Sequence, residues 1–129
     1  MERRELRVEG LAEPTAHYVD AVSYGGLLYI SGCGPIDREG RLVGGDDARE
    51  QTRQVLTNME MVLASAGATF ADVLAVTIYL VDIADRPRIN SVRADFFGDA
   101  KPASTLVGVS ELALEGMKVE IEAVAALGT

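Results

Sequence analysis

The sequence predicts an α+β fold in which two helices cover one face of a mixed β-sheet. Three observations support this prediction: strand-like alternation in the first third of the chain, two segments with apolar residues at helical spacing, and apolar strands between and after those helices. The element order is therefore β-β-β-α-β-α-β-β. Helices gathered on one side of such a sheet bury its apolar face, so the architecture is like a two-layer α/β sandwich.

Three short strands are expected in the first third of the chain. They cover residues 6–9, 17–23 and 27–32, where apolar and polar side chains alternate. Tyr24-Gly25-Gly26, between the second and third strands, is typical of a hairpin turn because glycine adopts positive φ at little cost. Residues 33–40 contain three glycine or proline residues and indicate a loop.

The first helix is expected at about residues 46–66. Asp46 or Asp47 can cap its N-terminus, and Gly67 can end it by adopting the left-handed conformation. Its apolar residues recur at helical spacing and form one stripe that faces a core. They are Val55, Leu56, Met59, Val62, Leu63 and Ala66.

The second half of the chain alternates strand and helix. Residues 73–81 are apolar on both faces of a strand, which indicates a central position in the sheet. The second helix is expected over residues 85–97, and Pro87 fits its first turn, where a missing N–H does no harm. Two final strands are expected at residues 103–109 and 117–126.

The last of these strands has two different faces, because side chains alternate along a strand. Helices on one side of the sheet cover only one face, so the other face needs a different cover. A mixed polar and apolar face suits a subunit interface that contains pockets, and the sequence therefore predicts an oligomer. The apolar face carries Val119, Ile121, Ala123 and Ala125, and the mixed face carries Lys118, Glu120, Glu122 and Val124.

Length and composition limit the classes of protein to which the chain can belong. With 129 residues, of which 48% are hydrophobic, it is expected to form one domain over residues 1–129 with a substantial core. No apolar run reaches the roughly 18 residues that cross a bilayer, and the charged N-terminus lacks the apolar segment of a signal peptide. We therefore expect a cytoplasmic protein without a membrane partner.

One cysteine and one histidine argue against an internal disulfide, a zinc cluster and a multi-histidine metal site. No cofactor and no metal are predicted. The net charge of −8 and the lack of a basic block argue against nucleic acid, because phosphate neutralisation needs clustered Lys and Arg. The expected partners are a small molecule and further copies of the chain.

Six short segments, spread in order over nearly the whole chain, are shared with one known family. They are His17–Val22, Ile30–Asp37, Gln51–Asn58, Asn90 with Phe96–Gly98, Lys101–Ala103 and Val119–Ala125. In these segments the chain resembles the RidA/YjgF family of small trimeric proteins. The resemblance implies a chorismate-mutase-like fold and a homotrimer, in which three sheets pack into a central barrel and three clefts lie between subunits.

The resemblance also implies which residues line such a cleft. In members that hydrolyse enamines and imines, it holds a tyrosine, a glycine, an asparagine, an arginine that grips the substrate carboxylate, and a glutamate that positions or activates water. Cysteine replaces a usual glutamine at Cys33, and leucine replaces a cysteine of some members at Leu106. The residues at the five cleft positions are Tyr18, Gly32, Asn90, Ser104 and Glu120.

Ser104 is the most informative departure, because it stands in place of the arginine. A serine hydroxyl can hydrogen-bond a substrate, but it supplies no fixed positive charge. An arginine–carboxylate contact is charge-assisted and roughly twice as strong as a neutral hydrogen bond. We therefore expect reduced activity on simple 2-imino acids. Arg93, one turn past Asn90, is either a substitute cation or, in the preferred interpretation, a solvated helix arginine.

Glu120 is the candidate catalytic residue. Glu122 lies on the same strand face about 7 Å away, because a strand rises about 3.3 Å per residue. A carboxylate buried in an apolar cleft has a raised pKa and can act as an acid or a base. The alternative is that both carboxylates are solvated or ion-paired at an interface.

Three other candidates each have a structural alternative. Tyr18 either positions a ligand through its hydroxyl or is a half-buried interface aromatic. His17 is either a general base, because its side chain titrates near neutrality, or a structural residue of a strand. Cys33 is either a reactive thiol, activated by His17 on a neighbouring strand, or an inert small hydrophobic residue.

These residues support two main hypotheses. The first is a trimeric enzyme whose clefts hydrolyse a small enamine, imine or related metabolite, with Glu120 as the acid or base and Tyr18, Gly32 and Asn90 positioning the substrate. The second is a non-catalytic module that binds a small ligand, such as a carboxylate, or serves a partner enzyme. The missing arginine favours this second hypothesis. A third hypothesis, ribonuclease activity, comes from the family's older name. It is the weakest of the three because the net charge is −8.

Overall fold

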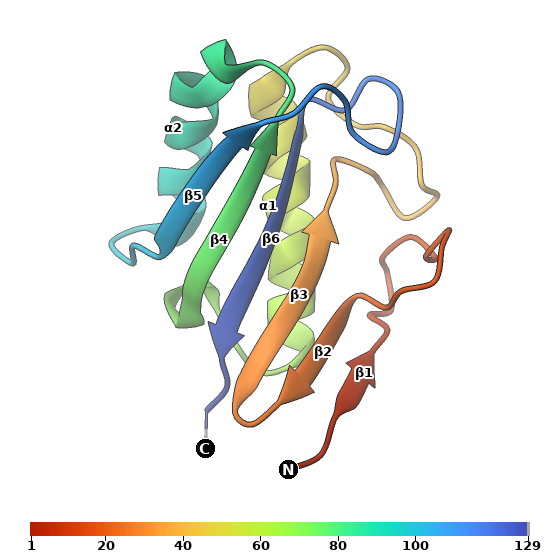
Figure 1. Ribbon diagram of the computed structural model, residues 1–129, viewed down its shortest axis with the longest axis vertical. Coiled ribbons are helices and arrows are strands. Elements are labelled where there is room, and N and C mark those ends of the chain that lie inside the picture. Colours follow the sequence, from red (N-terminus) through yellow and green to blue (C-terminus); the bar gives the residue numbers. More distant parts are fainter. Residues whose placement is uncertain (129) are drawn as a thin grey trace.

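Six strands form one curved sheet, and two helices lie across one of its faces (Figure 1). The structure is a computed structural model that describes residues 1–128. Its strands are β1 (Arg4–Leu6), β2 (Ala21–Tyr24), β3 (Leu27–Cys33), β4 (Val73–Leu80), β5 (Ala103–Gly108) and β6 (Val119–Ala126). Its helices are α1 (Ala48–Ser65) and α2 (Arg86–Phe97), and short 3-10 turns, η1 (Phe70–Asp72) and η2 (Ile83–Asp85), precede β4 and α2.

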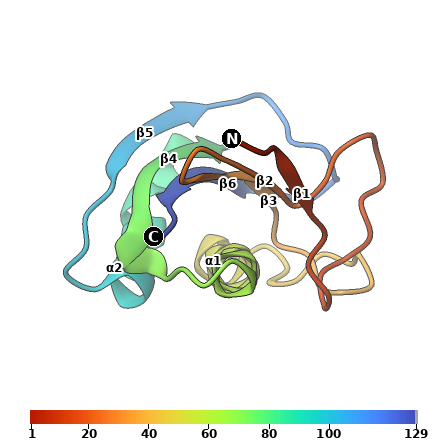
Figure 2. The ribbon, with the colours of Figure 1, turned by 90° about the horizontal axis from the view of Figure 1, so that it is seen from below.

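The strands follow the order β1-β2-β3-β6-β4-β5 across the sheet. Neighbouring strands are antiparallel except β4 and β5, which are parallel. Parallel neighbours need a crossover connection, which α2 supplies. Figure 2 shows both helices on the same side of the sheet. The predicted α+β fold, with its element order and one-sided helices, is therefore confirmed.

Helix α1 begins and ends where local chemistry favours it. Asp47 caps its start, because the carboxylate accepts hydrogen bonds from the backbone N–H groups of Arg49 (2.9 Å) and Glu50 (3.4 Å). The chain leaves the helix through Gly67, whose φ of 75° is unfavourable for other residues. The helix expected over residues 46–66 thus lies within two residues of its predicted bounds.

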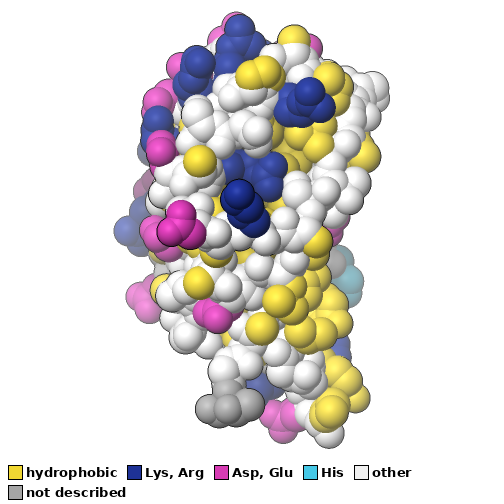
Figure 3. Space-filling model, turned by 90° about the vertical axis from the view of Figure 1, so that its left-hand side faces the viewer, with side chains coloured by type: hydrophobic (Ala, Val, Ile, Leu, Met, Phe, Trp, Pro, Cys, Tyr) yellow, Lys and Arg dark blue, Asp and Glu magenta, His cyan; other side chains and the backbone are white. Residues whose placement is uncertain are grey.

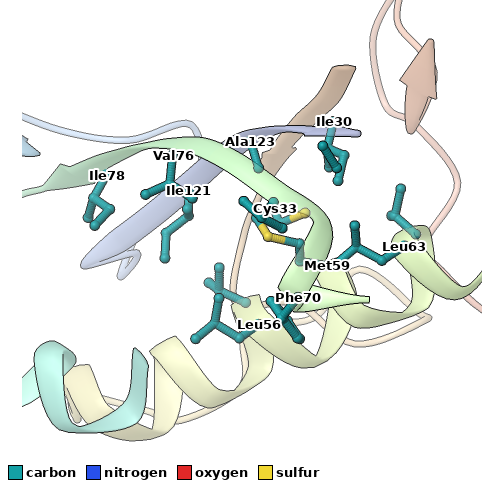
Figure 4. Close-up of a cluster of buried hydrophobic side chains, with 14 of the residues drawn as sticks. Ile30, Cys33, Leu56, Met59, Leu63, Phe70, Val76, Ile78, Ile121 and Ala123 are labelled. Carbon is teal, nitrogen blue, oxygen red and sulfur yellow. The ribbon is translucent and has the colours of Figure 1, made fainter. Parts of the chain in front are cut away.

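The core lies between α1 and the central strands. Figure 4 shows Leu56, Met59 and Leu63 of α1 directed toward the strands that carry Ile78 and Ile121. These five side chains are at most 1% exposed. Burying a side chain of this size contributes about 1.5–3 kcal/mol, so this layer holds α1 against the sheet.

The other face of the sheet is open and partly apolar. Along β6, buried residues alternate with half-buried ones, and Glu120, Glu122 and Val124 belong to the half-buried set, as predicted. Tyr29 of β3, which pairs with Val124, is 48% exposed on this face. Figure 3 shows hydrophobic side chains along this side of the molecule, at its right-hand edge in that view. Exposed apolar side chains gathered in this way are typical of an interaction surface.

The strand predicted for residues 17–23 begins only at Ala21. The residues before it form a turn, in which the Tyr18 N–H donates to the Ala16 carbonyl at 3.0 Å. This local hydrogen bond replaces pairing with a neighbouring strand. The alternation of polar and apolar residues does not reveal such a bond. His17 consequently lies exposed in the turn, and its placement in a strand is wrong.

The ends of the other five strands also differ from the prediction, by one to three residues. The strand expected at residues 6–9 is observed at Arg4–Leu6, because the Val8 N–H donates to the Asp20 carboxylate (2.8 Å) instead of to a strand. Strand β3 runs one residue past its predicted end, to Cys33, and its register with β6 shifts before that residue. This irregularity lies beside the candidate site.

Gln51 joins two loops that lie beside α1. Its side chain is fully buried, and its Nε2 donates to the carbonyls of Gly45 and Gly116, both at 2.8 Å. Its Oε1 accepts the Lys118 N–H at 2.7 Å. One side chain thus connects the loop before α1 to the loop before β6.

We predict that Gln51→Leu lowers the free energy of unfolding by about 2–3 kcal/mol, because it leaves shielded backbone groups without partners. Urea unfolding at a fixed protein concentration, followed by circular dichroism, measures the change. Thr57→Leu, at an exposed position of α1, is the control and should change stability by less than about 0.5 kcal/mol. Equal stability of the two variants would contradict the role assigned to Gln51.

Candidate functional site

A cavity of about 280 Å³ opens beside the end of β3 and the start of β6. Its wall comes from the N-terminal loop, β3, α1 and the loop before β6, and includes the apolar side chains of Leu11, Val62, Leu114 and Met117. A carboxylate at this place therefore meets less water than one on the surface. Four of the predicted site residues line the cavity: Tyr18, Gly32, Cys33 and Glu120.

Glu120 of β6 lies directly against the backbone of Gly32 in β3. A Cβ at position 32 would come within 2.9 Å of the Glu120 Cδ, so any larger residue there would displace the carboxyl group. Burial raises the pKa of Glu120 above its usual range, and the charge of Glu122 adds to this shift. A carboxyl group with a raised pKa can accept and return a proton closer to neutral pH.

Glu122 differs from Glu120 because it is held within the chain. The Tyr79 hydroxyl on β4 donates a hydrogen bond to the Glu122 carboxylate, and this bond is the main cause of the raised pKa of Tyr79. Burial and the charge of Glu122 raise the pKa of Glu120, and no hydrogen-bond donor in residues 1–128 counters this rise. Of the two carboxylates, Glu120 is thus the one available at the cavity.

Cys33 lines the cavity as a buried thiol. It is buried, and its Sγ donates to the Ser31 carbonyl at 3.6 Å. Burial raises the pKa of the thiol to about 12, and the charges of Asp20 and Glu120 add to the shift. His17, the hypothesised activator, is exposed and does not line the cavity. The structure therefore supports the interpretation of Cys33 as a small hydrophobic residue.

Asn90 and Ser104 lie together elsewhere, on α2 and β5. Arg93 joins them, because its Nη2 donates to the Ser104 Oγ at 3.1 Å and its Nη1 donates to the Asn90 Oδ1 at 3.5 Å. Strand β4 lies between β5 and β6, so one chain holds the predicted residues in two separate groups. We call them the Glu120 group (Tyr18, Gly32, Cys33 and Glu120) and the Ser104 group (Asn90, Arg93 and Ser104).

Two further residues singled out from the sequence lie outside this cavity. Leu106 pairs with Ile78 in the sheet and packs against the core instead of lining the cavity. Arg93 is half-buried, and burial lowers its pKa, so it is not a solvated helix arginine. Periodicity places Arg93 on a helix, but only the packing of α2 against β5 brings it to Ser104.

Asn58 is a cavity residue that the sequence analysis did not single out. It is buried in α1, and its Nδ2 donates to the carbonyls of Gly34 (3.0 Å) and Ile36 (2.9 Å), which holds the loop after β3 in place. A signal was available, because Asn58 lies beside Met59 within the apolar stripe of the helix. A polar side chain at such a position needs a buried partner.

The Glu120 group offers a carboxyl group and a phenol hydroxyl to a bound molecule. In residues 1–128, no three His, Cys, Asp or Glu side chains are arranged to hold a metal ion. No helix in the same part of the chain is long and apolar enough to cross a membrane. To a ligand, the cavity presents one acid–base group and hydrogen-bonding groups beside an apolar wall.

Comparison with known proteins identifies the family. Residues 10–127 match the family model described as Endoribonuclease L-PSP. The chain is 42% identical over 118 residues to a RutC family protein of Pyrococcus horikoshii, covering 91% of this chain and 92% of that protein. It is 36% identical over 125 residues to the 3-aminoacrylate deaminase RutC of Acinetobacter baylyi, covering 97% and 98%. The crystal structure of YyfA from Yersinia pestis, of the Rid protein family, superposes with a TM-score of 0.92 at 34% identity, covering 98% and 100%.

The fold is therefore the α+β fold of the YjgF-type proteins, with its helices on one face of a six-stranded sheet. The chain belongs to the Endoribonuclease L-PSP family, which includes RutC and Rid proteins. The resemblance to RidA/YjgF proteins that six sequence segments indicate is thereby confirmed.

We predict that the Cys33 thiol resists alkylation in the folded protein. A rise in pKa from 9.0 to about 12 lowers the thiolate fraction at pH 8 about a thousandfold, and burial blocks the reagent as well. Iodoacetamide labelling at pH 8, followed by mass spectrometry, should therefore be at least about a hundredfold slower than in urea-unfolded protein. Cys33 is the chain's one cysteine, so the readout is unambiguous. Equal labelling rates in the two states would contradict the inert assignment.

Proposed function

We propose that this protein is a homotrimer that hydrolyses a small enamine or imine in clefts between its protomers. One observation carries the catalytic part: the half-buried Glu120 carboxyl group, whose pKa is raised, lies against Gly32 in a cavity of about 280 Å³. The relative from Acinetobacter baylyi is a 3-aminoacrylate deaminase, and 3-aminoacrylate is an enamine. This relationship supports the same class of reaction here.

The trimer is supported by the separation of the two residue groups. Strand β4 lies between them in one chain, so a single chain does not bring the two groups to the same ligand. In the proposed trimer, the Ser104 group of one protomer faces the Glu120 group of its neighbour. The same contacts would cover the open sheet face, where Tyr29 is 48% and Val107 37% exposed.

In the proposed reaction, the substrate reacts as its protonated imine, and the Glu120 carboxylate accepts a proton from water as the water oxygen bonds to the imine carbon. The resulting amino alcohol then loses its C–N bond while the same carboxyl group returns the proton to nitrogen. Ammonia leaves, and the hydroxyl oxygen becomes the carbonyl of the product as its own proton passes to solvent. An enamine enters the same route after protonation at carbon, which converts it to the same protonated imine. Tyr18 and the Gly32 backbone line the cavity beside Glu120 and would position the substrate.

The second candidate is a protein of the same fold that binds a small ligand without turnover or assists a partner enzyme. The observation that favours it is Ser104, which stands where imine-hydrolysing relatives are expected to carry an arginine. Ribonuclease activity, which the description of the matching family names, is disfavoured by the net charge of −8.

We predict a trimer in solution. Size-exclusion chromatography with light scattering should report about 41 kDa, three times the chain mass of 13.7 kDa. The physical reason is that the exposed apolar side chains of the open face gain free energy when covered, by about 25 cal/mol per Å². A stable monomer would remove the basis for a cleft shared between protomers.

We predict that Glu120→Gln lowers the rate of ammonia release by at least about 10², because the variant keeps the shape of the side chain but loses its ionisable group. The substrate is 3-aminoacrylate or 2-iminobutanoate generated in situ, and ammonia is measured continuously. A general base works when ionised, and burial raises the pKa of Glu120, so wild-type rates should fall as pH drops through this raised value. The acidic limb should disappear from the residual activity of Glu120→Gln.

Glu122→Gln is the matched control, because it makes the same change one residue pair further along β6, where Tyr79 holds the carboxylate. It should reduce the rate much less. If Glu120→Gln leaves the rate and its pH dependence unchanged while the trimer persists, Glu120 is structural. Binding without turnover would then be the better account of the site.

A further inference from the structure

Arg93 is a half-buried cation without a carboxylate partner. Of the twelve Lys and Arg residues, only Arg93 and Lys118 are half-buried, and the others are exposed. Lys118 Nζ pairs with Asp46 at 3.1 Å. For Arg93, burial lowers the pKa and no carboxylate in residues 1–128 counters the shift. Removing a guanidinium from water without a counter-charge costs free energy, which a bound anion would offset.

Neutral side chains hold the guanidinium in place. The Ser104 Oγ lies 3.1 Å from its Nη2, and the Asn90 Oδ1 lies 3.5 Å from its Nη1. Arginine has five N–H donors in a planar fork, so two are used here and three remain for a ligand. Carboxylates match this fork geometrically.

The surface around Arg93 carries charges of both signs. Figure 3 looks onto the face formed by α2 and β5, where Lys and Arg side chains lie over the upper half with Asp and Glu side chains among them. Two other arginines on or beside α2 are paired with carboxylates: Arg53 with Asp95 at 3.6 Å and Arg88 with Asp85 at 3.0 Å. Arg93 differs from both because no carboxylate in residues 1–128 pairs with it.

We propose that Arg93 binds the substrate carboxylate from helix α2, in the space that the small side chain of Ser104 leaves open on strand β5. This inference rests on the proposed function and assigns the residue that selects an imino or enamine acid over a neutral imine. A longer residue at position 104 would occupy the place of the guanidinium, which lies 3.1 Å from the Ser104 Oγ. The proposal reverses the expectation that simple 2-imino acids are poor substrates.

The test compares binding of 2-oxobutanoate, a stable carbonyl analogue, with binding of its neutral methyl ester by isothermal titration calorimetry. The wild-type protein should prefer the acid. Arg93→Gln should raise the Kd of the acid about 10- to 100-fold, as expected for hydrogen bonds to a charged group, and leave that of the ester unchanged. Arg93→Lys keeps the charge but not the fork and should retain part of the preference. Arg86→Gln, which removes the same charge from an exposed position of α2, should change neither Kd.

The ratio of acid to ester affinity separates binding from a structural role, because a folding defect would weaken both ligands alike. The proposal is overturned if the wild-type protein binds acid and ester equally or binds neither. It is also overturned if Arg93→Gln still prefers the acid over the ester. If Arg93→Gln fails to fold, Arg93→Lys is the test, and a full wild-type preference for the acid in that variant overturns the proposal. Ammonia release that depends on Glu120 would preserve the proposed function in any of these cases. Acid preference that depends on Arg93, without hydrolysis, would retain the inference and favour the ligand-binding alternative.

Discussion

The central position of β6 is the constraint on which the rest of the structure depends. Because β6 lies between β3 and β4, each of its side chains must point either into the core or onto the open face. Val119 and Ile121 enter the core, so Glu120 between them turns the other way and meets the backbone of Gly32. Strand pairing on both sides therefore fixes the carboxyl group more tightly than a loop would.

Negative charge gathers around this carboxyl group and separates the roles of its neighbours. Tyr79 binds Glu122, so the Glu122 charge stays beside Glu120 and adds to the effect of burial in raising its pKa. The charges of Asp20 and Glu120 also help to raise the pKa of Cys33 to about 12, which keeps the thiol protonated. A site that disfavours anions in this way can hold a proton but is poorly suited to bind a substrate carboxylate.

The Ser104 group has the complementary character, since Arg93 brings an uncompensated positive charge to Ser104 and Asn90. One chain presents the acid–base group and the cation on opposite sides of β4. A closed ring of three copies would give every cleft one group of each kind, with the proton at one end of the substrate and its carboxylate at the other. In that arrangement the cation comes from helix α2, and the side chain at position 104 of β5 must be small to leave room for it.

The sequence by itself determined the order of the elements, the extent of α1 between Asp47 and Gly67, and the two faces of the last strand. These features depend on caps and on side-chain periods of 3.6 or 2 residues, which can be read within a short window. Six segments also pointed to Glu120 and Gly32. Only the tertiary structure decided that Cys33 is buried and that Arg93 reaches Ser104. Burial, charge and contact there come from elements brought together by folding, and no local pattern of residues encodes those distances.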